Sequence, residues 1–187
     1  VRISRAAAEQ RAGRAGRTAP GVAIRLWSEA LHRGLALQDR PEILEAELSG
    51  LALDCAAWGA APADLAFLDP PPAGAMAAGR ALLRELDALD AQGRITAMGR
   101  AMARMGTHPR LARMLLAAED EGEKALAADL AALLEERDPI RGKEAPSDVN
   151  LRLELLHGAD HRDADRATVQ RIRRAAAMHR RRLRLHG

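Results

Sequence analysis

Apolar residues recur at spacings of three and four along most of the chain, a pattern that predicts helices with one buried face. A first short helix is expected after Ser4, whose hydroxyl can cap a helix N-terminus. The second half of the chain is expected to form helices over about 97–105, 109–121, 123–136, 147–157 and 164–185. Because the connections between them are short, neighbouring helices should pack antiparallel into a bundle.

Two longer helices are predicted in the first half of the chain. One is expected to begin at Pro41 and end at Gly59, with a single apolar stripe of Leu44, Leu48, Leu51, Cys55 and Trp58. The other is expected from about residue 75 to Gln92, with Gly93 as its stop and with Leu82, Leu83, Leu86 and Leu89 buried. The proline-rich segment 62–72 between them predicts a rigid connector, and residues 94–96 are expected to form a small wing or hairpin strand.

Two segments are expected to differ from this helical pattern. Residues 22–27 contain β-branched and aromatic residues, which favour a strand, and a short helix is expected over about 28–37. Since the chain offers almost no partner for a strand, we expect it to be a piece of a larger protein. Residues 140–146 lack any apolar period and are expected to form a mobile loop.

Composition agrees with a mainly α fold. The chain has 187 residues, is 48% hydrophobic and 29% charged, and contains three aromatic residues, Trp27, Trp58 and Phe67. Such a scarcity of sheet-forming aromatics rules out an all-β fold. No apolar run suits a membrane span and no signal peptide is evident, so a soluble, cytoplasmic chain is expected. The single Cys55 excludes an internal disulfide and any Cys-based zinc site, and its place in a helical pattern predicts a buried small hydrophobic residue.

The net charge of +3 hides an uneven distribution along the chain. Residues 1–40 carry +5, residues 41–100 and 101–165 carry −5 each, and residues 166–187 carry +8. Basic clusters are where phosphate-bearing partners bind, so both ends of the chain are candidate contact regions.

The segment Gln10-Arg11-Ala12-Gly13-Arg14-Ala15-Gly16-Arg17 has a spacing that packing does not readily explain. If this turn is helical, Arg14 and Arg17 are neighbours, and Gly13 and Gly16 remove side chains beside them. Two planar guanidinium groups could then reach one compact anion while the backbone approaches closely. Such a pair suits a phosphoryl group, whose transition-state charge spreads over its equatorial oxygens.

This octet resembles motif VI, the Q-R-x-G-R-x-G-R signature of DEAH/RHA-type superfamily 2 ATP-dependent helicases, and the chain looks most similar to the bacterial HrpB group. The resemblance continues in four later segments and covers nearly the whole chain. These segments are Pro41-Glu42-Ile43-Leu44, Leu68-Asp69-Pro70-Pro71, Gly93-Arg94-Ile95-Thr96 and His108-Pro109-Arg110-Leu111-Ala112-Arg113-Met114-Leu115. It implies the end of a second RecA-like domain over 1–37, a winged helix over 38–96 and a helical ratchet-like domain over 97–187.

The resemblance also implies roles for individual residues. Arg14 and Arg17 match the arginine fingers that stabilise the γ-phosphate of ATP held on the other RecA-like domain. Gln10 matches the glutamine that positions the attacking water or phosphate, and Gly13 belongs to the same nucleotide-binding segment, whereas Arg11 is expected to be structural. In this family the later domains form one wall of the nucleic-acid channel, so single-stranded RNA, contacted through its backbone, and the missing RecA-like domains of the same protein are the expected partners.

The chain lacks the other half of an ATPase site. Gly142-Lys143-Glu144 is not a phosphate-cradling loop, and Asp120-Glu121 does not fit the family's Asp-Glu-x-His box. ATP and Mg²⁺ are therefore expected only in an intact 3′→5′ helicase that includes this chain, and no hydrolysis by this chain alone. The alternative is a stand-alone winged-helix nucleic-acid-binding or adaptor module without ATPase activity.

Two further features are weighed against ordinary structural explanations. His157 and His161, with Glu154, could share a helix face and bind a metal, but Gly158 weakens that helix and no third strong ligand follows, so no metal site is predicted. The arginine-rich helix near the C-terminus has an apolar side of Val169, Ile172, Ala176 and Leu183. It is expected either to dock on the acidic bundle or to face nucleic-acid phosphates, and it lacks the large apolar residues of a membrane-surface helix. With no aromatic-rich face for stacking, recognition should be of the backbone.

Overall fold

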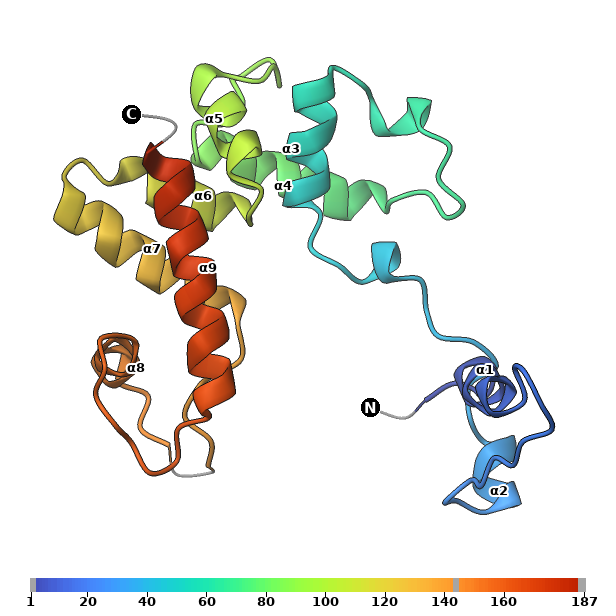
Figure 1. The fold of residues 1–187 in the computed structure, drawn as a ribbon. Coiled ribbons are helices and arrows are strands. Elements are labelled where there is room, and N and C mark those ends of the chain that lie inside the picture. Colours follow the sequence, from blue (N-terminus) through green and yellow to red (C-terminus); the bar gives the residue numbers. More distant parts are fainter. Residues whose placement is uncertain (1–2, 143–144, 185–187) are drawn as a thin grey trace. The chain divides into compact units, whose positions relative to one another are not determined.

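The computed structural model describes residues 3–142 and 145–184, and within them the chain is mostly helical (Figure 1). The α-helices are α1 (Arg5–Ala15), α2 (Glu29–Arg33), α3 (Ser49–Trp58), α4 (Ala73–Glu85), α5 (Ala97–Met105), α6 (Pro109–Ala117), α7 (Glu121–Glu135), α8 (Val149–Leu156) and α9 (Arg166–Arg184). Two 3₁₀ turns cover Glu42–Leu44 and Pro62–Asp64. The described ranges contain no sheet, only isolated antiparallel bridges between Leu89 and Ile95 and between Ile140 and Ala164. The prediction of a mainly α chain is confirmed.

The chain forms two compact units, one of residues 1–46 with 67–72 and the other of residues 47–66 with 73–187. The first contains α1 and α2, and the second contains α3 to α9. The expected boundaries at 37/38 and 96/97 remain predictions from the sequence. Contacts of α3 with both α5 and α6 join the segments on either side of the second boundary.

Side-chain caps hold the starts of several helices, and the cap at Ser4 was predicted from the sequence. The Ser4 hydroxyl accepts a hydrogen bond from the Ala7 amide at 3.0 Å, and the Thr96 hydroxyl accepts one from the Gly99 amide at 2.9 Å. Asp120 caps α7 in the same way. These side chains satisfy amide groups that the first turn of a helix leaves without partners.

The helix expected to begin at Pro41 is shorter than predicted. Only a 3₁₀ turn forms at Glu42–Leu44, and α3 begins at Ser49. The buried face of α3 consists largely of small residues, because α4 approaches closely there: a Cβ added to Gly79 would lie 3.0 Å from the Ser49 amide nitrogen. The prediction of a buried apolar stripe is therefore wrong at its C-terminal end, because Trp58 is 83% exposed there.

The second predicted helix also ends early, at Glu85 instead of Gln92. Asp87 adopts a positive φ of 59°, and the chain then turns so that Leu89 and Ile95 form their bridge. This bridge agrees with the small extended wing expected around residues 94–96. Leu83 and Leu89 are buried as predicted, whereas Leu82 and Leu86 are only partly buried.

The strand expected at residues 22–27 does not form. Residues 21–25 have no regular secondary structure, and Val22, Ile24 and Leu26 are 85%, 81% and 91% exposed. A strand without a neighbour has no partners for its amide and carbonyl groups, which explains why the local preference alone does not produce one.

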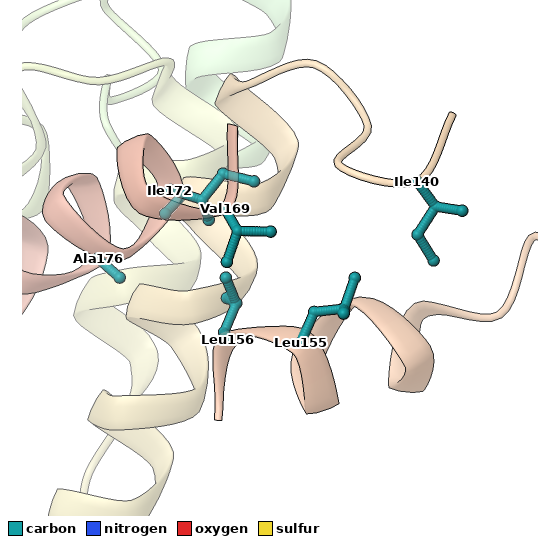
Figure 2. Close-up of a cluster of buried hydrophobic side chains, with 7 residues drawn as sticks. Ile140, Leu155, Leu156, Val169, Ile172 and Ala176 are labelled. Atoms are coloured by element: carbon teal, nitrogen blue, oxygen red, sulfur yellow. The ribbon is translucent and has the colours of Figure 1, made fainter. Parts of the chain in front are cut away.

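Helix α9 packs against α7 in the second unit (Figure 1). One core cluster joins these helices to α8 and contains Ala132, Ile140, Leu155, Leu156, Val169, Ile172 and Ala176 (Figure 2). Ile140 is 3% exposed, so the loop expected over 140–146 is anchored at its first residue. Residues 143–144 of that loop, which include part of the Gly-Lys-Glu segment considered above, lie outside the described residues.

Candidate nucleotide site and basic surfaces

Helix α1 carries most of the motif VI residues, and its start is held by the segment that follows α2. The Arg5 and Ala6 amides donate hydrogen bonds to the carbonyls of Ala36 and Leu37 at 2.8 and 3.0 Å. Together with the Ser4 cap, these bonds occupy the unpaired amides at the start of the helix. The start of α1 is thus tied down, and the predicted site residues lie toward its other end.

Gln10, Gly13 and Arg14 lie in α1, and all three residues are exposed to solvent. The helix ends at Ala15, so Arg17 lies beyond it, in the turn that follows Gly16. The Gly16 amide closes this end by donating a hydrogen bond to the Gly13 carbonyl at 3.3 Å. The condition under which Arg14 and Arg17 would be neighbours on one helix is therefore not met, because only Arg14 is part of α1.

The glycines of this region have different surroundings. A Cβ added to Gly13 would meet no atom within 4 Å, and one added to Gly16 would meet only the Ala19 carbonyl oxygen, at 3.9 Å. One added to Gly21 would lie 1.9 Å from the Ala15 carbonyl oxygen. The close return of the chain to the end of α1 thus requires glycine at 21, whereas nothing among the described residues requires glycine at 13.

The two predicted arginine fingers have no ion-pair partner within the described part of the chain. Both are exposed. Their guanidinium groups can therefore meet an external anion without first breaking an internal salt bridge, which is the electrostatic requirement for a phosphate contact.

The apolar side predicted for the C-terminal basic helix is confirmed. Val169, Ile172, Ala176 and Leu183 of α9 are all buried, and the first three belong to the cluster of Figure 2. The helix is thus docked on the bundle.

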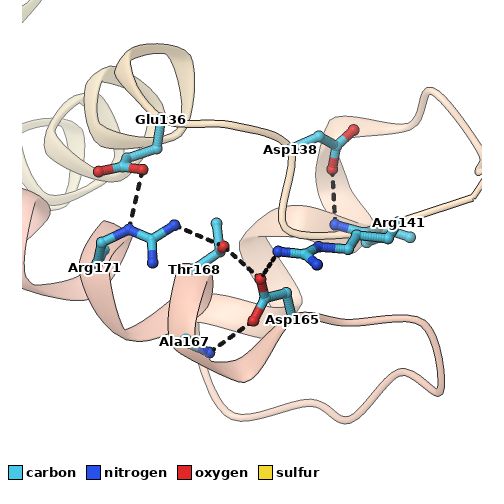
Figure 3. Close-up of polar contacts among 8 residues, drawn as sticks. Glu136, Asp138, Arg141, Asp165, Ala167, Thr168 and Arg171 are labelled. Atoms are coloured by element: carbon cyan, nitrogen blue, oxygen red, sulfur yellow. Dashed lines mark hydrogen bonds and ion pairs between the residues drawn. The ribbon is translucent and has the colours of Figure 1, made fainter. Parts of the chain in front are cut away.

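Several α9 arginines are engaged within the protein. Arg171 pairs with Glu136 at 3.4 Å (Figure 3), Arg180 pairs with the buried Asp129, and the Arg173 guanidinium donates to the carbonyls of Leu155 and Leu156. The Arg182 guanidinium donates to the Met105 carbonyl. Four exposed arginines of this helix have no ion-pair partner in the described ranges: Arg166, Arg174, Arg181 and Arg184. One group of α9 arginines therefore contacts the bundle, and the other forms an outward basic face.

Two carboxylates stabilise the chain between α7 and α9 (Figure 3). Thr168 donates a hydrogen bond to Asp165, and this bond is the main cause that keeps the pKa of that carboxyl below its ordinary value. Arg152 is 8% exposed and pairs with Asp138 at 2.6 Å. The Asp138 pKa is lowered chiefly by this bond to Arg152, although partial burial acts in the opposite direction.

The histidines considered as metal ligands have other contacts. His157 Nε2 lies 3.3 Å from a carboxylate oxygen of Asp129, and His161 Nδ1 accepts the Asp163 amide at 3.2 Å. Within the ranges that the structure describes, no group of three metal-binding side chains is found.

In the same ranges, no helix is both long and apolar enough to cross a membrane.

A second basic surface lies where α3, α4 and α5 meet the turn that precedes α5. A cleft of about 660 Å³ is lined by four arginines, Arg80, Arg84, Arg94 and Arg100, with Cys55 among its walls. An adjoining hollow of about 300 Å³ contains Trp58, Asp54, Arg100 and Arg104. The sequence prediction missed this surface, although the four-residue spacing of Arg80 and Arg84, and of Arg100 and Arg104, places each pair on one helix face.

Comparisons with known proteins agree with the resemblance seen in motif VI. The family described as helicase associated domain (HA2), winged-helix, matches residues 81–106. The ATP-dependent RNA helicase HrpB of Escherichia coli (strain K12) is 44% identical over 136 residues, which cover 72% of this chain and 17% of the relative. A crystal structure of the Escherichia coli DEAH/RHA helicase HrpB matches 100% of this chain and 22% of its own, with a TM-score of 0.74 at 35% identity. The chain corresponds to the C-terminal region of DEAH/RHA helicases.

The similarity extends beyond bacteria and beyond one solved structure. The pre-mRNA-splicing factor ATP-dependent RNA helicase prp22 of Schizosaccharomyces pombe is 41% identical over 122 residues, covering 64% of this chain and 10% of the relative. A crystal structure of the Escherichia coli DExH-box NTPase HrpB matches with a TM-score of 0.63 at 37% identity and covers 100% of this chain and 21% of its own. The chain thus spans at most about a fifth of the length of these relatives, and the predicted DEAH/RHA relationship and HrpB similarity are confirmed.

Proposed function

We propose that this chain is the accessory C-terminal part of an ATP-dependent 3′→5′ RNA helicase, in which it supplies arginine fingers and one wall of the nucleic-acid channel. The proposal is carried by the motif VI octet at the exposed end of α1, in a chain that corresponds to the C-terminal region of DEAH/RHA helicases. Residues 1–37 would then end a RecA-like domain, 38–96 would form a winged helix and 97–187 a ratchet-like bundle. Single-stranded RNA, or DNA, would be contacted through its backbone, and the intact protein would act in the cytoplasm.

Arg14 and Arg17 are assigned to the transition state of ATP hydrolysis. Their guanidinium groups are exposed and have no ion-pair partner among the described residues, which suits the charge that spreads over the equatorial oxygens of the γ-phosphate. Gln10 is assigned to orient the attacking water or a phosphate oxygen, and Gly13 to admit the nucleotide to the backbone. In the intact protein, Mg²⁺ bound with ATP neutralises phosphate charge, and its ligands and the phosphate-cradling loop would come from RecA-like domains outside this chain.

The finger assignment is tested with Arg14→Ala in the intact protein, by measuring RNA-stimulated ATP turnover. We expect kcat to fall by about 10³- to 10⁵-fold, the range typical of arginine fingers. Arg40→Ala is the matched control, because Arg40 is exposed and, among the described residues, pairs with the exposed Glu45 alone, at 3.1 Å. Turnover of Arg14→Ala close to that of Arg40→Ala would contradict the assignment.

The upstream reading frame separates this proposal from a stand-alone binding module. A phosphate-cradling G-x-x-x-x-G-K-[ST] loop followed by an Asp-Glu-x-His box would support the helicase. A stop codon immediately upstream of Val1 would instead support the module.

A further inference from the structure

Within the residues that the structure describes, the basic cleft and the adjoining hollow are where exposed cations combine with a largely exposed aromatic residue. Trp58 is the last residue of α3, and Gly59 ends that helix with a left-handed φ of 73°. The Ala60 amide then donates to the Cys55 carbonyl at 3.0 Å. Trp58 is 83% exposed and lines the hollow together with Arg100 and Arg104. The sequence had predicted this residue to be buried in the core.

The charge of this surface is largely available to a ligand. Arg80, Arg84, Arg100 and Arg104 form no salt bridge within the described ranges, although the Arg100 guanidinium donates to the Ile95 carbonyl at 3.2 Å. Arg94 is held by Asp90 at 2.8 Å, and Asp54 is the one carboxylate among the residues that line the two hollows. In the part of the chain that the structure describes, four guanidinium groups without an ion pair thus face a single carboxylate, a balance of charge that favours a polyanion.

We propose that this surface, formed by Trp58, Arg80, Arg84, Arg100 and Arg104, is a binding site for single-stranded nucleic acid. One base stacks on the Trp58 indole, and neighbouring phosphates contact the arginines of α4 and α5. An aromatic platform beside a cationic groove is the combination by which proteins bind single strands without reading their sequence. An acidic peptide would satisfy the arginines but would not use the open face of the indole. The proposal rests on the proposed function only in taking nucleic acid as the ligand.

Cys55 does not contribute chemistry to this site. Its side chain is buried, and burial raises the pKa of the thiol, an effect that the Asp54 charge increases and Arg80 opposes. A protonated, buried thiol is a poor nucleophile, so the cleft is suited to binding and not to covalent catalysis.

The test uses the 187-residue chain and a fluorescein-labelled oligouridine of about 12 nucleotides, with an abasic strand of the same length as the second probe. Trp58→Ala should weaken oligouridine binding by about 5- to 150-fold and leave abasic binding nearly unchanged, because only a base can stack. Trp58→Phe should retain most of the affinity. Circular dichroism should show unchanged helix content, since Trp58 is outside the core.

The electrostatic part is tested with Arg104→Ala, which should weaken both probes and reduce the slope of log affinity against log salt by about 0.7. Arg110→Ala is the matched control, an exposed arginine on α6 that lines neither of the two hollows. In a Trp27→Phe background, oligouridine should quench Trp58 fluorescence and the abasic strand should not.

An unchanged affinity of Trp58→Ala for oligouridine would overturn the proposal even if Arg104→Ala weakened binding. Binding of polyglutamate in place of oligouridine would overturn it in favour of a protein partner. None of these measurements needs ATP, so their outcome is independent of the result for Arg14→Ala.

Discussion

Gly13 illustrates how a single residue can be explained by function and not by packing. It lies in the last turn of α1, where an added Cβ would meet no atom within 4 Å, and its φ is not positive. Glycine inside a helix costs about 0.5–1 kcal/mol relative to alanine. Gly13 therefore weakens its own helix without relieving a close contact, which favours the interpretation that it leaves space for a ligand.

Gly13→Ala should therefore have opposite effects on stability and activity. In the 187-residue chain it should stabilise α1 by up to about 1 kcal/mol, measured as increased amide protection of that helix. In the intact protein it should lower ATP turnover by hindering approach of the nucleotide to the backbone. Gly74→Ala in α4, where an added Cβ also meets nothing within 4 Å, is the control, and equal turnover of the two variants would contradict the role of Gly13.

Asp138 gives the stability of the second unit a defined pH dependence. Its pKa is lowered in the folded state, first by the hydrogen bond from Arg152 and against the opposing effect of burial. A carboxyl with a lowered folded pKa contributes stability that is complete above its unfolded pKa and is lost as pH falls through the folded value. Chemical unfolding should thus show stability falling below about pH 4, and Asp138→Asn should reduce that slope. An unchanged slope in Asp138→Asn would show that other carboxyls cause the acid dependence.

At the scale of elements, the sequence predicted helices best where local signals determine their ends. The helices predicted over about 97–105 and 109–121 begin where α5 and α6 begin, and the structure shows a Thr96 cap before α5 and proline in the first turn of α6. The failures occurred where tertiary contacts decide. The start and buried face of α3 depend on small residues that allow α4 to approach at Gly79. The spacing of large apolar residues along the sequence does not predict contacts of this kind.

Arg180 of α9 tests how strongly this helix depends on its polar contacts with α7. It pairs with Asp129, whose side chain is only 4% exposed, and His157 Nε2 lies 3.3 Å from the other oxygen of that carboxylate. Arg180→Ala would leave a buried charge short of a partner and should destabilise the second unit by about 2–3 kcal/mol in denaturant titration. Arg181→Ala, an exposed neighbour on the same helix, should change stability by less than about 0.5 kcal/mol. Equal effects of the two substitutions would contradict the importance of this pair.

At the scale of the whole molecule, the candidate sites differ in how far the sequence revealed them. Motif VI was found because its residues are adjacent along the chain, although the end of α1 before Arg17 could not be foreseen from spacing. The Trp58 surface was missed because its residues come from three helices, and only folding brings them together. The sequence likewise could not separate docking from an outward basic face on α9, since the arginines that contact the bundle and those that face outward occur along the same helix.

The exposed apolar segment of the first unit provides a test of the proposed domain organisation. Val22, Ile24 and Leu26 are almost fully exposed in a segment without regular structure, which is unfavourable for β-branched and leucine side chains in isolation. If residues 1–37 end a RecA-like domain, neighbouring strands of that domain would supply the missing hydrogen bonds and cover these side chains. Amides 22–26 should then exchange rapidly in the 187-residue chain and at least about 100-fold more slowly in the intact protein, whereas amides of α7 should be protected in both. Rapid exchange of this segment in the intact protein would contradict its assignment to a sheet.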